Sequence, residues 1–405
     1  MASESHRNHP KRWKWRLEWL AQTTLEKLAG LLPSPLAFRV GEILGGLAYH
    51  LMSSRRQIVL RNLRIAFYQE KQLPELRRMV RETFRRTGAN LFSALHSSQL
   101  SAEQVGELVT LENPELVSAA LTRRSGVVLM PSHMGNWEIL TRIHRQFPPG
   151  HKNGAFYRPL NNPLLDQRVL AQRESEGCRL FSKRDSFHQA TAFLREGGIL
   201  GILADQRVGN QGELVRFFGR LTRASPLPSL LARRSKTEAL AISLVTQAPG
   251  KWQVRFHPLD GPIRTETCMA AIEQAIKASP LDYFWLQERW KIYISPRRTI
   301  RDWLGPEVAA EKQGTPHRAL LWLPGTPDGW HLPDSWTHSE VIYQTIPKSA
   351  TPPPTAHQPL ARLLEQIDAT HALPIDYILT CHASKALIKA ARSQSIPLIS
   401  LPSLP

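Results

Sequence analysis

The sequence has few cysteines, no long uncharged apolar run and too few acidic residues to balance its basic ones. Three cysteines occur in 405 residues, and their wide spacing matches no disulfide framework, metal-binding motif or redox motif: Cys178, Cys268 and Cys381. We therefore expect idle or buried thiols in a reducing compartment, and neither a metal ion nor another cofactor. The first residues are polar and resemble no cleavable signal, so we expect the chain to remain on the cytoplasmic side.

Lysine and arginine outnumber aspartate and glutamate by 52 to 34, which gives a formal net charge of +18. Such an excess favours an anionic partner, whether a nucleic acid, a membrane surface or an acidic protein. The sequence carries no helix-turn-helix, zinc-finger or RNA-recognition pattern. We therefore expect no nucleic-acid partner and favour an anionic membrane surface or an acidic protein.

The N-terminal segment, residues 1–54, combines basic side chains with tryptophans, which favour the headgroup level of an anionic bilayer. Residues 28–52 are apolar overall, but Pro33, Pro35, Arg39 and Glu42 interrupt them. No stretch reaches the roughly 18 uncharged residues of a spanning helix. We expect a monotopic hairpin or a pair of interfacial helices; a solvated arm and one tilted span are the alternatives.

Residues 55–300 are expected to form the main domain. They are expected to be helical up to residue 122, with arginines on the outer faces that are either solvated or dock phosphate groups or an acidic carrier: Arg77, Arg78, Arg81, Arg85 and Arg86. From residue 123, short apolar strands alternate with helices, which predicts an α/β fold with a mixed, mostly parallel sheet covered by helices. The expected strands are 127–130, 154–157, 199–204, 239–246 and 252–256, and the expected helices are 164–176, 186–196, 225–235 and 265–278.

The last hundred residues have a different texture. Residues 301–316 resemble a linker, and residues 317–405 predict a small α/β unit with strands near 319–323, 340–345, 377–379 and 398–401. Helices are expected at 359–369 and 383–393. This unit resembles half of a Rossmann-like or glycosyltransferase-like domain, but it carries no nucleotide-binding fingerprint. Its role stays open.

The chain is expected to be organised around residues 126–138, which read GVVLMPSHMGNWE. Four uncharged apolar residues predict a strand buried on both faces. His133 follows the strand, at the edge where open α/β sheets bind ligands. Asn136 is a candidate N-cap of a helix over 137–147, and Glu138 would fold back from its first turn to fix the imidazole as a general base.

The pattern His-x4-Asp/Glu is weak by itself, because the chain has fifteen histidines and His371 and Asp376 also match it. That second pair follows a proline-rich stretch with no buried strand in front. His133 in isolation can equally be a satisfied histidine at a strand end. The strand before His133, rather than the spacing, supports the catalytic interpretation.

Four stretches in the right order, within about residues 15–295, together resemble one family. They are HMGNWE at 133–138, YRPLNNPL at 157–164, LADQ at 203–206 with VRFFG at 215–219, and YFWL at 283–286 with RWK at 289–291. They are similar to the signatures of the lipid A late acyltransferases, which belong to the lysophospholipid acyltransferase group. The sequence departs from the family at two places. RASP at 223–226 stands where the family usually has Thr and Gly, and Gln287-Glu288 stands where it usually has His-Arg.

The resemblance implies that a fatty acyl group passes from acyl carrier protein to a hydroxyl of a lipid A precursor at the cytoplasmic face of the inner membrane. His133 would remove the hydroxyl proton, Glu138 would orient it, and turn amides or Asn136 would hold the oxyanion. Arg158 would bind phosphate or phosphopantetheine. Further expected substrate-binding residues are Asp205, Gln206, Phe218, Gly219 and Arg289.

Several alternatives stay open beside this interpretation. The donor can be acyl-CoA, the acceptor a lysophospholipid, aminolipid or glycolipid, and residues 317–405 a glycosyltransferase-like or docking unit. Asp205 can pair with Arg207 or cap a loop, while Phe217 and Phe218 can line an acyl channel or fill the core.

Overall fold

The computed structural model describes residues 12–67, 70–124, 126–147, 151–174, 177–182, 187–208, 212–291, 317–323, 341–346, 354–371 and 375–400. The chain divides into two compact units. Unit 1 comprises residues 1–57, 77–208 and 224–287, and unit 2 comprises residues 58–76, 209–223 and 288–405. This division does not follow the expected boundary near residue 300. The expected linker 301–316 lies outside the described residues.

Unit 1 is built on a seven-stranded sheet with the order β1-β9-β8-β2-β5-β3-β4. All neighbours are parallel except β8 and β9, so the expected mixed, mostly parallel α/β fold is confirmed. The strands are β1 (Val109–Glu112), β2 (Val127–Pro131), β3 (Asn153–Phe156), β4 (Arg179–Phe181), β5 (Ile199–Gly201), β8 (Glu238–Ala248) and β9 (Lys251–Pro258). β1 and β4 were missed by the sequence analysis, because each is only three or four residues long and β1 lies in the stretch that was expected to be helical.

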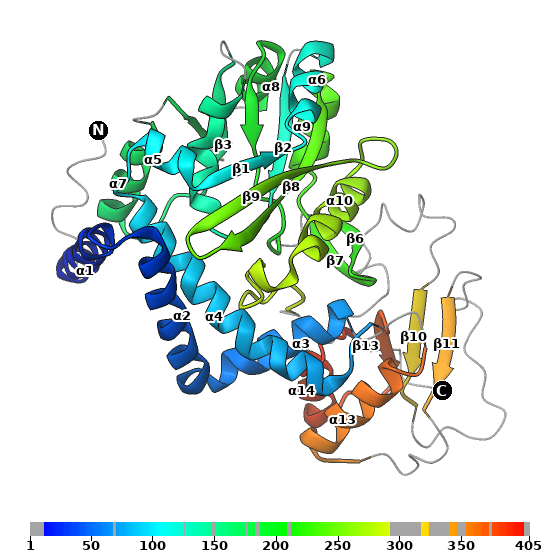
Figure 1. The fold of residues 1–405 in the computed structure, drawn as a ribbon. Coiled ribbons are helices and arrows are strands. Elements are labelled where there is room, and N and C mark those ends of the chain that lie inside the picture. Colours follow the sequence, from blue (N-terminus) through cyan, green and yellow to red (C-terminus); the bar gives the residue numbers. More distant parts are fainter. Residues whose placement is uncertain are drawn as a thin grey trace. The chain divides into compact units, whose positions relative to one another are not determined.

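Helices surround this sheet (Figure 1). They are α1 (Arg12–Gly30), α2 (Ser34–Leu51), α4 (Leu73–Ser97, in unit 1 from residue 77), α5 (Ala102–Glu107), α6 (Glu115–Arg124), α7 (Pro163–Glu174), α8 (Phe187–Arg195), α9 (Leu227–Ser235) and α10 (Thr265–Ala278). Val127 and Leu129 of β2 join one buried cluster with Phe38, Ala89 and Val117 of the helices. Val128 and Met130 alternate with them and face the opposite side of the sheet. β2 is therefore buried on both faces, as its composition predicts.

The predicted helix over residues 137–147 is wrong in type. Two short 3-10 turns replace it: η1 (Trp137–Thr141) and η2 (Ile143–Gln146). The Asn136 side chain makes no cap hydrogen bond to η1; it is buried and donates from Nδ2 to Ser97 Oγ at 3.1 Å. Gly135 has a φ of +58°, and a Cβ atom there would lie 2.7 Å from the Leu244 carbonyl oxygen. The turn after His133 thus depends on glycine.

A buried carboxylate ties α4 to the segment before the expected C-terminal signature. Asp282 in η3 (Pro280–Asp282) accepts hydrogen bonds from Arg86 and Asn90 at 3.2 and 3.1 Å, and from the Thr246 hydroxyl at 2.6 Å. The Arg86 guanidinium also lies over the Phe38 ring. Arg86 is therefore a structural ion-pair partner, which corrects its expected place on an outer face.

Close packing of α2 on α4 depends on glycines at their crossing (Figure 1). A Cβ atom at Gly41 would lie 2.5 Å from the Gly88 carbonyl oxygen, and one at Gly45 would lie 2.2 Å from that of Phe84. Neither distance admits a side chain, so the two backbones touch. Within the described residues, no helix has the length and apolarity needed to cross a membrane.

We predict that Gly45→Ala destabilises the protein by about 1–3 kcal/mol or more, because the methyl group overpacks the helix crossing. The matched control is Gly46→Ala, since a Cβ atom there meets nothing closer than Arg85 Cγ at 3.8 Å. Alanine exceeds glycine in helix propensity by about 1 kcal/mol, so the control should be neutral or more stable. Urea unfolding midpoints measure both effects. Equal midpoints for the two variants would contradict a close contact of the α2 and α4 backbones.

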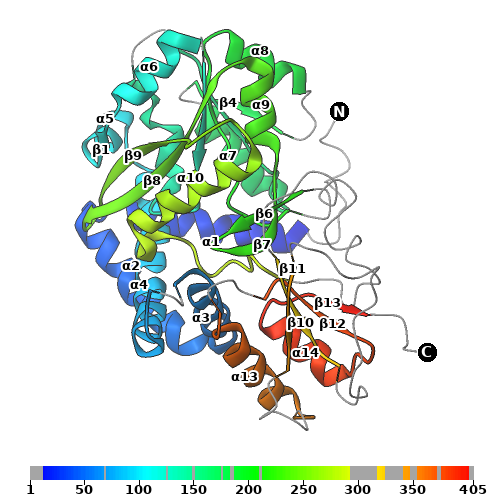
Figure 2. The same cartoon turned by 90° about the vertical axis from the view of Figure 1, so that its right-hand side faces the viewer.

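Unit 2 contains a four-stranded, all-parallel sheet in the order β11-β10-β12-β13. Its strands are β10 (His317–Leu321), β11 (Val341–Thr345), β12 (Tyr377–Thr380) and β13 (Leu398–Ser400), with α13 (His357–Asp368) and α14 (Lys385–Ser393). The expected strands and helices of residues 317–405 are thus confirmed within the described residues. Unit 2 also includes the hairpin β6 (Glu213–Phe217) and β7 (Arg220–Ala224), and α3 (Ser53–Phe67) from residue 58. Figure 2 gives a second view of these elements.

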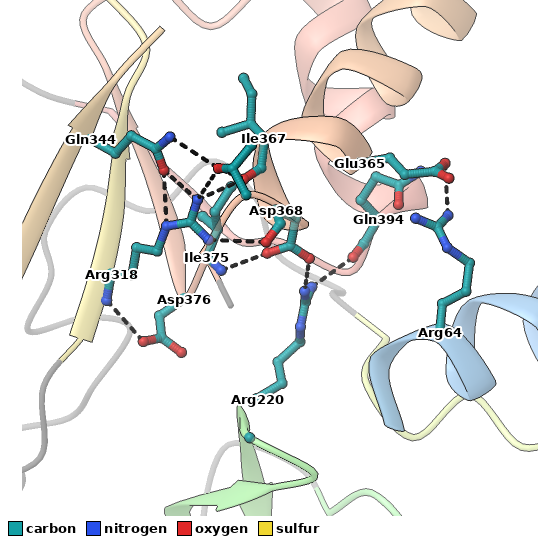
Figure 3. Close-up of polar contacts among 12 residues, drawn as sticks. Arg64, Arg220, Arg318, Gln344, Glu365, Ile367, Asp368, Ile375, Asp376 and Gln394 are labelled. Carbon is teal, nitrogen blue, oxygen red and sulfur yellow. Dashed lines mark hydrogen bonds and ion pairs between the residues drawn. The ribbon is translucent and has the colours of Figure 1, made fainter. Parts of the chain in front are cut away.

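Arg318 of β10 organises the small sheet from inside. Its side chain is fully buried and donates to the carbonyl oxygens of Ile367 and Asp368 at 2.6 and 3.0 Å, and also to the Gln344 side chain (Figure 3). The carbonyl groups at the end of a helix lack intrahelical partners and carry partial negative charge, so a cation there is stabilising. Arg318 therefore caps the C-terminus of α13 and joins this helix to β10 and β11.

Arginines from α3 and the β6–β7 hairpin bind acidic groups of the small sheet unit. Arg64 pairs with Glu365 at 2.7 Å, and Arg220 pairs with Asp368 (Figure 3). Arg216 makes two parallel hydrogen bonds to Asp376, at 3.1 and 2.9 Å. Asp376 also accepts from the backbone amide of Arg318. The C-terminal segment and these two earlier elements are therefore one packed unit.

Substituting Asp376 tests whether this packing stabilises the hairpin. Asp376→Ala leaves the mostly buried Arg216 guanidinium without its carboxylate, which we expect to cost about 3–5 kcal/mol locally. Hydrogen exchange of amides in β6 and β7 should accelerate, whereas that of β2 and β8 in unit 1 should not. Unchanged exchange in β6 and β7 would show that the C-terminal segment does not support the hairpin.

Candidate active site

His133 lies directly after β2, at the carboxyl end of the central strands of the unit 1 sheet. Its side chain is 16% exposed, so one edge of the ring is open to solvent. The ring meets the Trp137 ring edge-on, with 5.2 Å between centroids, and Trp137 in turn contacts Phe284. These aromatic contacts limit the ring's rotation.

The carboxylate that contacts His133 is Asp205 rather than Glu138. His133 Nδ1 lies 2.8 Å from Asp205 Oδ1, and the His133 backbone amide donates to Asp205 Oδ2 at 3.2 Å. Asp205 follows β5, which is hydrogen-bonded to β2, so the two residues meet where parallel neighbouring strands end. Asp205 therefore fixes the ring, and the sequence interpretations of an Arg207 pair or a loop cap do not describe its main contacts.

These contacts define the hydrogen-bonding state of the ring. An ionised carboxylate only accepts, so the His133 proton resides on Nδ1 and the lone pair on Nε2. The Gln206 side-chain nitrogen lies 3.2 Å from Nε2 and can donate to it. A neutral imidazole with its Nε2 lone pair at the exposed edge has the form of a general base.

The electrostatic surroundings favour the charged form of this ring. Burial lowers the pKa of His133, but the charge of Asp205 and its hydrogen bond raise it, with a smaller contribution from Glu138. The net result is a pKa above the usual 6.5. Although burial opposes it, the same pair holds the pKa of the Asp205 carboxyl below its ordinary value. The site thus stabilises the imidazolium that forms when the base accepts a proton.

Glu138 lies in the first 3-10 turn and makes different contacts. Its Oε2 accepts from Arg173 of α7 at 2.6 Å, and its Oε1 accepts from the Trp137 indole at 3.1 Å. The expected direct orientation of His133 by Glu138 is therefore corrected: Glu138 acts on the ring through its charge. Its role in catalysis stays a prediction.

An apolar cavity of about 70 Å³ lies beside these residues. Trp137 and Glu138 line it near the site, and Leu140, Phe147, Phe156 and Leu203 are among its apolar walls. Because Trp137 contacts both the His133 ring and this cavity, it links the two. A narrow apolar space next to a base suits a hydrocarbon chain better than a polar ligand.

Two other predicted residues of unit 1 lie apart from the His133 ring. The Asn136 amide nitrogen is used by Ser97, and the Gly135 backbone amide donates to the Asp282 carbonyl oxygen at 2.9 Å. Neither group therefore suits the expected oxyanion role in this arrangement. Arg158 is exposed after β3 and is not part of the cavity wall. Its predicted phosphate contact stays a prediction.

Three further predicted residues belong to unit 2. Phe218 and Gly219 form the turn of the β6–β7 hairpin, with φ values of +50° and +72°. Phe218 is buried against Phe67 and Trp290. Arg289 is buried and donates to the Thr222 hydroxyl at 2.7 Å. Each makes structural contacts inside unit 2, and their substrate-binding roles stay predictions.

The sequence analysis did not place Gln287 or Tyr283 in the site. The Gln287 side-chain nitrogen donates to Asp205 Oδ2 at 3.1 Å and lies 2.6 Å from the Tyr283 hydroxyl. Tyr283 and Phe284 pair with the turn after His133, because the Phe284 amide donates to the His133 carbonyl oxygen. The departure from the family at Gln287 could have signalled its position, since it lies next to the expected C-terminal signature.

Comparison with known proteins shows the family of the chain. Residues 1–292 match the family described as bacterial lipid A biosynthesis acyltransferase. The chain belongs to this family. It is 26% identical over 293 residues to a lipid A biosynthesis lauroyltransferase of Escherichia coli (strain K12), which covers 70% of this chain and 93% of that protein. The acyltransferase therefore acts in the biosynthesis of lipid A or a related lipid.

Two further relatives show the range of the family. A lipid A biosynthesis palmitoleoyltransferase of Escherichia coli (strain K12) is 24% identical over 292 residues, covering 70% of this chain and 92% of that protein. A phosphatidylinositol mannoside acyltransferase of Mycobacterium tuberculosis (strain ATCC 25618 / H37Rv) is 26% identical over 196 residues, covering 45% of this chain and 60% of that protein. The names of these relatives thus specify different acyl chains and different lipids.

The contacts of Asp205 predict a pH dependence for acyl transfer. The neutral ring is the base, so the rate should rise with pH through the raised pKa of His133. Asp205→Asn removes the charge that raises this pKa and leaves burial, so the midpoint should move to lower pH. The plateau rate should fall by about 10²-fold or more, because the ring loses its fixed orientation.

Glu138→Gln serves as the comparison in the same rate–pH measurement. Glu138 contributes less than Asp205 to the pKa of His133, so the midpoint should move in the same direction by a smaller amount. If Glu138→Gln shifts the profile more than Asp205→Asn does, Glu138 rather than Asp205 is the partner of the base.

Proposed function

We propose that the protein transfers a fatty acyl chain from acyl carrier protein to a hydroxyl group of a lipid A precursor. The observation that carries this proposal is the His133 ring, held at Nδ1 by buried Asp205 with Nε2 at an exposed edge beside an apolar cavity. Membership of the family supplies the reaction class. The basic character of the chain suits an acidic carrier and a phosphorylated acceptor.

In the proposed reaction, His133 Nε2 removes the proton of the acceptor hydroxyl while its oxygen attacks the thioester carbonyl carbon. The Gln206 amide, 3.2 Å from Nε2, withdraws to admit the hydroxyl and then donates to the oxyanion. The tetrahedral intermediate collapses, the C–S bond breaks, and the thiolate takes the proton back from His133. No acyl-enzyme intermediate is required.

The acyl chain is proposed to occupy the cavity beside Trp137. At about 70 Å³ the cavity is smaller than the roughly 300–1,000 Å³ of typical ligand pockets. Side chains of its wall therefore move when the chain enters, and the half-exposed Leu203 at its rim is the first candidate. Removing the bulk of this side chain should change which acyl length is preferred.

The same proposal places the protein at the cytoplasmic face of the inner membrane. Large apolar side chains are exposed along α1, α2 and the turn between them: Trp13, Leu17, Leu20, Leu28, Leu31, Ile43, Leu44, Leu47 and Leu51. Leu31 and Leu51 are 80% and 83% exposed, although water disfavours such side chains. Exposed apolar residues on helices with basic neighbours favour attachment in the plane of the interface.

Replacement of His133 tests the proposed base. His133→Ala should lower acyl transfer from acyl carrier protein to a lipid A precursor by at least about 10²-fold, since the proton acceptor is lost. His188→Ala is the matched control, because this histidine is exposed on α8. Transfer is measured by mass spectrometry of the product lipid. An unchanged rate in purified His133→Ala protein would reject the proposed mechanism.

The same assay distinguishes between the candidate acyl donors and between the candidate acceptors. Acyl carrier protein and coenzyme A thioesters of one chain length are compared, and a lipid A precursor is compared with a mannosylated phosphatidylinositol. We expect the carrier-protein thioester and the lipid A precursor to give the higher kcat/KM. A preference for the mannosylated lipid would instead support the acceptor named for the mycobacterial relative.

A further inference from the structure

A groove of about 360 Å³ runs between α2 and α4 in unit 1, on the surface next to their glycine crossing. The crossing brings the helix backbones together. Gly46 lines the groove, and a Cβ atom there would meet nothing closer than Arg85 Cγ at 3.8 Å. The groove is thus a consequence of small residues at a close helix crossing.

Basic residues from both helices line the groove. They are Arg39 and His50 of α2 and Arg81 and Arg85 of α4, with Glu42 as the single lining carboxylate. Three guanidinium groups therefore share the groove with one carboxylate, an excess of two positive charges. Glu42 is shared, because it accepts from Arg39 at 2.6 Å and lies 3.6 Å from Arg85.

Arg81 is the cation that this internal pairing leaves available. Its side chain is exposed, and no ion pair joins it to another residue in the described part of the chain. Arg85, by contrast, divides its contacts between Glu42 and Glu82. An anion in the groove would bind Arg81 directly. It would also contact Arg39 and Arg85, which share Glu42 as their carboxylate partner.

α2 also contributes apolar residues to the groove, and its exposed apolar surface continues beyond the groove. Ile43 and Leu47 line the groove although they are 66% and 56% exposed. Leu44 and Leu51 extend the same exposed face along α2. A groove whose cations stand next to exposed apolar residues of α2 matches an amphiphile whose phosphate is joined to hydrocarbon chains.

We propose that the α2–α4 groove binds the phosphate headgroup of an anionic phospholipid in the membrane surface. The phosphate lies against Arg81, Arg39 and Arg85, and the apolar face of α2 rests among the acyl chains. An acidic carrier protein would use the arginines but would leave the apolar face of α2 in water. This inference rests on the proposed membrane attachment and is independent of the chemistry at His133.

The test measures binding of the full-length protein to vesicles of phosphatidylcholine with and without phosphatidylglycerol, by flotation. Gly46→Leu fills the groove without changing any charge, and it adds apolar surface. A bound headgroup therefore requires that Gly46→Leu lower the preference for phosphatidylglycerol vesicles by about tenfold. A diffuse electrostatic attraction requires that it leave the preference intact, which would overturn the proposal.

Matched arginine variants of α4 separate a site from general charge. Arg81→Ala removes a groove residue, whereas Arg78→Ala removes an equally charged, exposed residue of the same helix that does not line the groove. We expect Arg81→Ala to lower the preference by about tenfold and Arg78→Ala by no more than about fivefold, the effect of one basic residue at an anionic surface. Equal losses would overturn the proposal.

The same variants, together with His133→Ala, distinguish headgroup binding from carrier binding and from catalysis. If Gly46→Leu and Arg81→Ala bind vesicles like the parent but bind acyl carrier protein more weakly, the groove is a carrier site and the proposal is wrong. Vesicle binding by His133→Ala should equal that of the parent, because the site needs no acyl donor. Acyl transfer without headgroup preference rejects only the groove, and headgroup preference without acyl transfer rejects only the proposed reaction.

Discussion

The active site depends on one buried, ionised carboxylate, which needs hydrogen-bond donors for both of its oxygens. Asp205 has no exposed surface, and burial of an unpaired carboxylate is strongly unfavourable. Its two oxygens accept from the His133 ring, the His133 amide and Gln287. The groups that satisfy Asp205 are therefore the same groups that fix the base. The folding requirement and the geometry required for proton transfer coincide at this pair.

A second buried carboxylate holds the parts of the site together. Asp282 receives donors from α4 and β8, and its own carbonyl oxygen receives the Gly135 amide. The next residues pair with the turn after His133 and carry Gln287 to Asp205. Segments that lie more than a hundred residues apart in the sequence are thus aligned by hydrogen bonds to one anchored turn.

The sequence predicted five of the seven strands of the sheet and the position of His133, because buried runs and strand ends leave local signals. It misassigned the orienting carboxylate, because the spacing from His133 to Glu138 is a local pattern while Asp205 arrives through the pairing of β2 with β5. The contact between His133 and Asp205 could have been predicted, since both residues follow buried strands that were expected to be parallel. The 3-10 turns were not predictable, because the apolar residues of 137–147 fit an α-helix equally well and the contact of Asn136 with Ser97 joins residues distant in the sequence.

The C-terminal segment adds a further constraint. The matched lauroyltransferase is covered over 93% of its length by residues that precede this segment, so the segment is additional to that relative. Yet its acidic groups pair with Arg64 of α3 and with Arg216 and Arg220 of the hairpin, all within the family-matching residues. Removing it would take away the carboxylates that pair with these three arginines. The segment therefore stabilises a hairpin that follows Asp205 closely in the sequence and lies within the family-matching residues.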